Sequence, residues 1–233
     1  MIRGVIFDLD DTLYDYKGCD RRATQQLLRF MQYTFGLQEE QGLTCIKQAK
    51  QIVKERLGNT AACHNRMLYM QTISELCHAN PVQYSWAMYN AYWDTLLAHM
   101  KLFSYVKPLF ALLKQNDIKI AILSDLTAHI QHRKLLHLGV AEDVDVLVTS
   151  EEAGAEKPSP KMFELVEKKI AFDKKELLMI GDSLQKDVKG ATNYGIPAVW
   201  FSESKSEPDQ NTGEEIIQYL KERIEHEYEF KRN

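Results

Sequence analysis

Cysteine, proline, glycine and long apolar runs are all scarce in this sequence. Its 233 residues include 11 glycines, 6 prolines and 4 cysteines, which excludes collagen-like, low-complexity and disulfide-scaffold proteins. No uninterrupted apolar stretch approaches the roughly 18 residues that span a membrane. A strand-like run begins at Ile2 and leaves no room for a signal peptide. We therefore expect a cytoplasmic protein with no membrane partner.

An excess of positive charge is also missing. The chain has 29 basic and 33 acidic residues, a net charge of −4, which gives no general attraction to nucleic acid or anionic lipid. The cysteines form no Cys-x-x-Cys pair, so we predict reduced, mostly buried thiols rather than a zinc site. His129 and His132 lie three residues apart on a predicted helix and are interpreted as a surface pair rather than a metal site. The four cysteines are Cys19, Cys45, Cys63 and Cys77.

The chain does contain alternating strand and helix patterns. A short apolar run at residues 4–7 is typical of a strand buried on both faces. Residues 14–100 show only helical periodicity, and strands are predicted again at 119–123, 144–148, 177–180 and 198–201, separated by helices. This order predicts an α/β protein with a doubly wound parallel sheet and an inserted all-α cap. The predicted boundaries are residues 1–14 and 101–233 for the core and 15–100 for the cap.

Within the predicted cap, apolar residues recur at helical spacing. Leu43, Ile46 and Val53 fall on one such face, and Trp86, Tyr89 and Trp93 begin an aromatic stripe. We interpret these faces as packing surfaces between the cap helices.

Polar residues stand where the predicted strands end. Ligands of open α/β sheets bind beyond the carboxyl ends of the strands, so these side chains are expected at one edge of the sheet. Four carboxylates gathered there with one ammonium would repel one another unless a divalent cation lay among them. Oxygen ligands and an open site fit Mg²⁺, which would make the edge attractive to a phosphate ester. The residues are Asp8, Asp10, Ser124, Lys157, Asp182 and Asp187.

Four ordered motifs carry a family resemblance. Asp8-Leu9-Asp10-Asp11-Thr12-Leu13, Leu123-Ser124-Asp125, Lys157-Pro158 and Gly181-Asp182-Ser183 with Asp187 resemble the motifs of the haloacid dehalogenase-like hydrolase superfamily. Their order and spacing match across nearly the whole chain, and the helical insertion resembles the cap that this family places after the first motif. The resemblance implies a Rossmann-like core and Mg²⁺ as cofactor.

The resemblance also implies roles for single residues. Asp8 would be the nucleophile, forming an aspartyl-phosphate and ligating Mg²⁺. Asp10 would protonate the leaving alcohol and then activate water, while its backbone carbonyl binds the metal. Ser124 would hydrogen-bond the transferring phosphoryl group, and Lys157 would orient Asp8 and offset charge in the transition state. Thr12 would belong to the same phosphate-binding set.

The remaining motif residues complete the expected site. Asp182 would be the second carboxylate on the metal, and Asp187 would support the metal or Lys157. Asp125 is expected beside the phosphate, with its backbone N–H pointing inward. The sequence departs from the family pattern at Asp125 and at Lys186, since many relatives have Asn at both positions.

The predicted function is that of a Mg²⁺-dependent phosphomonoester hydrolase acting on a small phosphorylated metabolite. A phosphomutase of the same superfamily and a non-catalytic phosphate-binding scaffold are the alternatives. Dehalogenation and phosphonate cleavage are disfavoured because those relatives lack an acid at the position of Asp10. A response-regulator receiver domain is disfavoured because it is about half as long and carries its phosphoacceptor after the third strand.

The sequence does not determine the substrate. The resemblance assigns substrate selection to the cap and to the loop after the first motif. Nucleoside monophosphates, flavin mononucleotide, phosphoglycolate and sugar phosphates are all compatible, and the aromatic pair Tyr14 and Tyr16 slightly favours a nucleotide or flavin phosphate. The candidate residues are Tyr14, Tyr16, Lys17, Arg21, Arg22, Asn65 and Arg66.

Overall fold

The computed structural model describes residues 1–232, and the side chains of the last helix up to residue 226. The strands are β1 (Gly4–Phe7), β2 (Lys119–Ser124), β3 (Val146–Thr149), β4 (Leu177–Gly181) and β5 (Ala198–Trp200). The helices before β2 are α1 (Tyr16–Phe35), α2 (Glu39–Leu57), η1 (Ala61–His64), α3 (Arg66–Leu76), α4 (Pro81–His99) and α5 (Val106–Gln115). The later ones are α6 (Ala128–His137), α7 (Ser150–Ala153), α8 (Pro160–Ile170), η2 (Lys174–Glu176), the π-helical turn η3 (Leu184–Val188), α9 (Lys189–Tyr194) and α10 (Gly213–Arg232).

The five strands form one sheet in the order β3-β2-β1-β4-β5, and all neighbouring pairs are parallel. From β1 the chain builds outward through β2 and β3 and then crosses to β4 and β5 on the other side. The strand order therefore reverses between β1 and β4, the position at which open α/β sheets bind ligands beyond the carboxyl ends of the strands. The predicted doubly wound α/β fold is confirmed.

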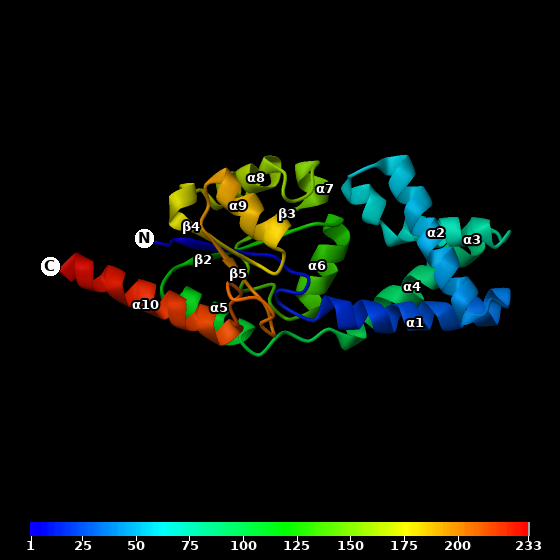
Figure 1. Cartoon of the computed structure of the whole chain (residues 1–233), viewed down its shortest axis with the longest axis horizontal. Helices are drawn as coiled ribbons and strands as arrows, with labels where there is room; N and C mark the ends of the chain where they lie inside the picture. The colour runs from blue at the N-terminus through cyan, green and yellow to red at the C-terminus, as the bar shows by residue number, and fades with distance from the viewer. Residues whose placement is uncertain (233) are drawn as a thin grey trace.

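Both faces of the sheet are covered, which explains why the strands read as continuous apolar runs. Val5 and Phe7 pack on the side that carries α5, α6 and α10, whereas Ile6 points to the side of α8 and α9. Figure 1 shows α8 and α9 on one side of the sheet and α5 and α10 on the other. This burial holds the strand ends, and the polar residues that follow them, at fixed positions.

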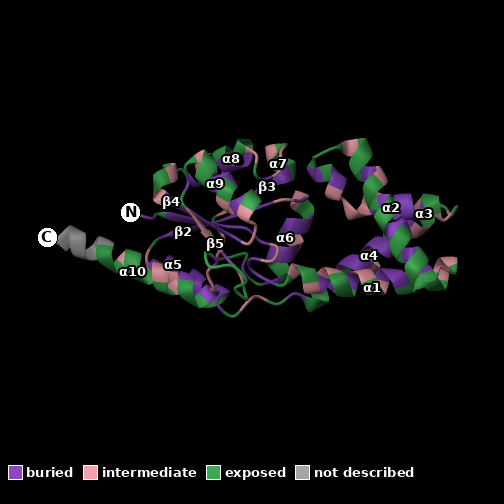
Figure 2. Cartoon of the chain, in the orientation of Figure 1, coloured by how far each residue is buried: buried purple, intermediate pink, exposed green. Residues whose placement is uncertain are grey.

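The helices α1 to α4 form the insertion after β1, at the right of Figure 1. Helix α4 begins after Asn80, whose side chain accepts hydrogen bonds from the N–H groups of Val82 and Gln83, with Pro81 in the first turn. Figure 2 shows that the helix faces turned toward one another are the buried ones. The helical insertion is confirmed, and we keep the predicted boundaries, 14/15 and 100/101, as a proposal.

Two chain segments join the insertion to the sheet, and they lie side by side. Tyr14 pairs with Leu102 in an isolated antiparallel bridge, and the N–H of Phe103 donates to the carbonyl oxygen of Leu13 at 2.9 Å. The two connections therefore form one narrow neck next to the loop that follows β1.

Two residues that were predicted to pack between the cap helices lie at the surface instead. Leu43 is 46% exposed and Trp86 is 62% exposed. Trp86 lies at the surface, stacked on Tyr89, whereas Tyr89 and Trp93, the other two residues of the predicted stripe, are buried as expected. A helical stripe that contains Trp and Tyr is broad, and its outer edge can stay in solvent.

The cysteines are free thiols as predicted, with Cys19, Cys45 and Cys63 buried and Cys77 partly buried. His129 and His132 are both exposed on α6, in agreement with the surface interpretation. Among the described residues no helix is long and apolar enough to cross a membrane. A cytoplasmic location remains a prediction.

The positions of the cap leucines lead to a stability test. We expect Leu96→Ala to lower the free energy of unfolding by about 2–5 kcal/mol, because a fully buried leucine leaves a cavity. Leu43→Ala is the matched control and should cost less than about 1 kcal/mol. Urea unfolding followed by circular dichroism measures both, and equal losses would contradict the packing described for the cap.

Candidate active site

Asp8 stands at the start of the loop that follows β1 and is 6% exposed. Its N–H donates to the carbonyl oxygen of Ile180 on the neighbouring strand at 3.0 Å, so the residue is fixed by the sheet. Its Oδ2 accepts from the hydroxyl of Thr12 at 3.2 Å. The Thr12 oxygen in turn accepts from the N–H of Asp182 at 3.1 Å. Thr12 is fully buried, so its hydroxyl joins the loops after β1 and β4 inside the protein.

Lys157 is the cation of this site. Its Nζ donates to Asp8 Oδ1 at 2.5 Å and to Asp187 Oδ1 at 2.6 Å, and the residue is 4% exposed. Burial alone would lower the pKa of Lys157, but Asp187 and Asp8 outweigh burial and raise it. Lys157 therefore stays charged and holds Asp8 and Asp187 together.

Three carboxylates share this small volume. Oxygen atoms of Asp8, Asp182 and Asp187 lie within 4.8 Å of one another. Burial raises the pKa of Asp8 well above its usual range, against the opposing effect of Lys157, and Asp187 and Asp182 raise it further. Burial also raises the pKa of Asp182 to about 6, with Asp187 and Asp11 contributing. The negative charge exceeds what one ammonium offsets, and the oxygen donors fit a hard divalent cation.

Glycine at the end of β4 makes room for this arrangement. A Cβ on Gly181 would lie 2.4 Å from Cγ of Asp187, closer than any side chain allows. Asp187 comes from η3 and also accepts the N–H of Ser183 at 3.0 Å. The Gly181-Asp182 pair thus ends the strand and brings Asp187 against Lys157.

The carboxylate of Asp10 lies outside this cluster. Both of its oxygens accept from Nζ of Lys134 at 2.7 Å, and Oδ1 also accepts from the hydroxyl of Tyr14 at 2.6 Å. Lys134 belongs to α6, is fully buried, and lies within 6 Å of the ring centres of Tyr14, Tyr16 and Trp93. Two acids separated by one residue therefore have different surroundings, one with Lys157 and one with Lys134.

Ser124 ends β2, and its hydroxyl oxygen accepts from Nε2 of Gln131 at 2.7 Å. The side chain of Asp125 accepts hydrogen bonds from two lysines. Oδ1 accepts the N–H of Lys157 at 3.0 Å, and Oδ2 accepts Nζ of Lys186 at 2.8 Å. The two positions at which the sequence departs from the family pattern are therefore paired with each other.

The structure adds functional residues that the sequence reasoning missed. Gln131 and Lys134 lie on α6 and are both fully buried. Polar residues are spread along the sequence of this helix, so the pattern did not predict that these two would be buried. The only sequence signal was their place, six and nine residues after Asp125. Tyr14 is also fully buried, so it offers no face for stacking on a nucleotide or flavin, contrary to the preference drawn from Tyr14 and Tyr16.

Residues 2–195 match the haloacid dehalogenase-like hydrolase family. The chain belongs to this family. The sequence-based resemblance is confirmed, and so are the predicted fold and the enzyme class, a phosphatase among these hydrolases.

Several characterised relatives align over most of their length. A ribulose-1,5-bisphosphate 5-phosphatase from Halopiger xanaduensis is 35% identical over 88% of this chain and 87% of its own. A glyceraldehyde 3-phosphate phosphatase from Methanopyrus kandleri is 30% identical over 88% and 86%. The human N-acylneuraminate-9-phosphatase is 26% identical over 87% and 84%.

Solved structures agree on the fold. A 2-haloacid dehalogenase from Pseudomonas syringae superposes with a TM-score of 0.75 at 18% identity, covering 98% of this chain and 100% of its own. The HAD-hydrolase YfnB from Bacillus subtilis, whose crystal structure contains magnesium, superposes with a TM-score of 0.68 at 22% identity, covering 94% and 98%. At this identity the likeness concerns the fold alone.

The raised pKa of Asp182 predicts a pH-dependent stability in the presence of a chelator. Because the pKa of Asp182 is higher in the folded state than in the unfolded state, the folded state binds its proton more tightly. The stability that this proton adds to the folded state is lost as the pH rises from about 4 through about 6. Asp182→Asn should remove the loss, gaining on the order of 2–3 kcal/mol relative to the natural protein between pH 4 and pH 7. Urea unfolding in EDTA at both pH values measures this. A difference that does not change with pH would contradict it.

Proposed function

We propose that this protein hydrolyses the phosphomonoester of a small phosphorylated sugar, with Mg²⁺ held at Asp8 and Asp182. One observation carries the proposal. Asp8 lies in the cluster that fits a cation, whereas the carboxylate of Asp10 lies outside it, held by Lys134. Hydrolysis through a covalent intermediate needs this division between a nucleophile and an acid/base.

In the first step, a carboxylate oxygen of Asp8 attacks phosphorus and the bond to the sugar oxygen breaks. Asp10 gives a proton to that oxygen as it leaves. Lys157, already bonded to Asp8, orients the nucleophile and offsets negative charge on the phosphoryl group. The hydroxyl of Ser124 accepts from Gln131 and donates weakly, at 3.3 Å, to the carbonyl oxygen of Asp125, and we propose that it donates to a phosphoryl oxygen when substrate binds.

In the second step, water attacks the aspartyl-phosphate. Asp10, now ionised, takes a proton from the water, and the bond between phosphorus and the Asp8 oxygen breaks to release phosphate. Mg²⁺, when bound, supplies positive charge for the carboxylates and the phosphate oxygens. Asp187 keeps Lys157 in place through both steps.

Lys134 acts as a positioning residue for Asp10. Four carboxylates stand close to this strand edge, and an unrestrained Asp10 could turn onto the cation and be lost as an acid. The paired contacts of Lys134 with both Asp10 oxygens hold that carboxylate away from the cluster. Burial lowers the pKa of Lys134, although Asp10 opposes this effect.

The sugar assignment rests on the relatives and on one groove. The three relatives described above are phosphatases named for ribulose bisphosphate, glyceraldehyde phosphate and N-acylneuraminate phosphate. A groove of about 570 Å³ between α1 and α2 is lined by four basic residues, Lys17, Arg21, Lys47 and Lys50, and by two acidic ones, Asp20 and Glu39. Lys17 reaches Asp11 of the catalytic loop at 3.2 Å. The groove thus begins at the site and favours a substrate with a second anionic group.

The central test is phosphate release from a substrate panel with Mg²⁺. Ribulose 1,5-bisphosphate, glyceraldehyde 3-phosphate and N-acylneuraminate 9-phosphate should be hydrolysed faster than flavin mononucleotide or nucleoside monophosphates. EDTA and Asp8→Asn should each abolish release, while circular dichroism shows a folded variant. Release from nucleotides alone would overturn the sugar assignment. Isomerisation of a sugar phosphate instead of release would favour the phosphomutase, and binding without turnover would favour the scaffold.

The role of Lys134 is tested by the choice of leaving group. General acid–base catalysis contributes about 10²–10⁴-fold, so we expect Lys134→Met to lower kcat for the best sugar phosphate roughly 10–100-fold, with little change in KM. The loss in kcat/KM, which reports on the first step alone, should be smaller for p-nitrophenyl phosphate, whose leaving group needs no proton. Lys107→Met, at an exposed lysine paired with Asp143, is the control. Equal losses on both substrates would contradict the positioning role.

A further inference from the structure

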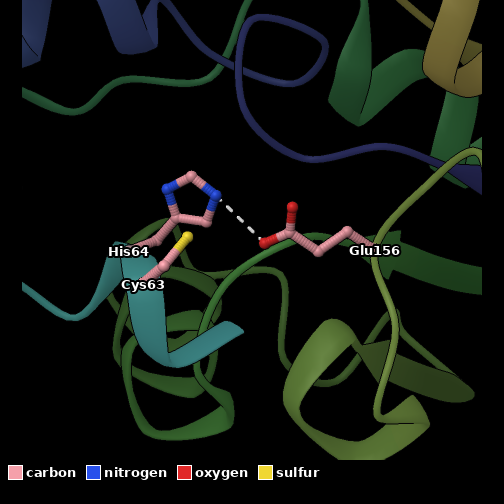
Figure 3. Close-up of side chains that lie close together, drawn as sticks. All are labelled: Cys63, His64 and Glu156. Carbon is pink, nitrogen blue, oxygen red and sulfur yellow. Dashed lines mark ion pairs between the residues drawn. The ribbon is translucent and has the colours of Figure 1, made fainter. Parts of the chain in front are cut away.

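A second cluster of ligating side chains lies at the contact between cap and core, separate from the phosphatase site. Cys63 and His64 come from η1, the short turn between α2 and α3, and Glu156 comes from the core loop before Lys157. One ligating atom of each lies within 4.8 Å of the other two. Figure 3 shows the sulfur, the imidazole and the carboxylate directed toward one another.

The protein's own contacts leave this cluster only partly satisfied. His64 Nε2 lies 3.0 Å from Glu156 Oε1 as an ion pair, with the side chains 36% and 14% exposed. Glu156 Oε1 is buried and, apart from this ion pair, has no hydrogen-bond partner among the described residues. Cys63 is 1% exposed. Because the imidazole is charged only when it is protonated, a bound cation would give this buried carboxylate oxygen a positive partner whatever the state of His64.

The backbone around the cap residues is fixed before any ligand binds. The hydroxyl of Tyr69 donates to the carbonyl oxygen of Cys63 at 2.5 Å, and Nη1 of Arg66 donates to that of His64 at 2.8 Å. On the core side, the carbonyl oxygen of Glu156 accepts the N–H of Ser159 at 2.9 Å. Only side-chain rotation is then needed to bring three ligands to the spacing of a tetrahedral site, roughly 3.3–3.8 Å between ligand atoms.

We propose that Cys63, His64 and Glu156 bind a Zn²⁺-class divalent cation that ties the cap to the core. A thiolate, an imidazole and a carboxylate are the ligands that Zn²⁺ takes in proteins, with water in the fourth position. Mg²⁺ does not compete, because it prefers oxygen ligands. On binding, the Cys63 thiol loses its proton to solvent and its sulfur bonds the cation.

Such a cation has a mechanical consequence. The neck at Tyr14 and Leu102 already joins cap to core on one side, and the Cys63–His64–Glu156 site would join them again at the residue before Lys157. Helix α6 also meets the cap helix α4 through an ion pair between Arg133 and Asp94 at 3.5 Å, so the cation would add a further attachment to those already present. The cation therefore holds the cap against the core.

The first test uses Co²⁺ as a spectroscopic substitute for Zn²⁺, with excess Mg²⁺ present to fill the oxygen-rich site. One equivalent of Co²⁺ should give a thiolate-to-cobalt charge-transfer band that Zn²⁺ displaces. Cys63→Ser should abolish the band, His64→Gln should weaken binding at least about tenfold, and Cys45→Ser, at another buried cysteine, should keep it. No band in the natural protein, or an unchanged band in Cys63→Ser, would overturn the site.

The second test follows the cap contact itself. Hydrogen exchange of residues 61–66 should slow in the natural protein when Zn²⁺ is added and should not change in Cys63→Ser. Equal exchange with and without Zn²⁺ in the natural protein would overturn the link between cap and core. Both tests are free of substrate, so their outcome is independent of the proposed phosphatase reaction.

Discussion

One buried ion pair network determines the arrangement of this active site. Lys157 lies between Asp8 and Asp187, out of contact with solvent, and each carboxylate belongs to a different loop. Without the ammonium, these buried acids would repel one another, and a buried charge without its partner is strongly destabilising. With it, the cluster still carries excess negative charge, since Asp182 joins the other two acids. Asp8 and Asp187, which Lys157 joins, therefore also belong to the acidic cluster that fits a divalent cation.

A second lysine separates the roles of the two acids in the first motif. Lys134 holds Asp10, and it does so from α6, the helix that follows Ser124. Asp10 also accepts from Tyr14, which stands at the neck between core and cap. The proposed acid/base therefore lies where the two parts of the chain meet. A movement of the cap would reach Asp10 through Tyr14, while Asp8 stays fixed by the sheet.

The cap contributes more than cover for the site. Its basic groove begins at Lys17, next to the catalytic loop, and its η1 turn contacts the core at Glu156. The groove supports the proposed sugar-phosphate substrate, and the η1 contact supplies the ligands of the proposed cation site. Neither feature belongs to the four motifs.

The sequence by itself determined the sheet, the helical insertion and the motif residues, because apolar periodicity and polar strand ends are local patterns. It also predicted that the acids gather at one edge, where parallel strands end, and this holds for Asp8, Asp182 and Asp187 but not for the carboxylate of Asp10. Only the tertiary structure decided that Lys134 holds Asp10, that Asp125 pairs with Lys186, and that Tyr14 is buried. It alone joined Cys63 and His64 to Glu156, across 92 positions of the chain. Such contacts depend on how helices pack against a sheet. Helical periodicity predicts which face of a helix is buried, but it does not predict which residue a polar side chain on that face will contact.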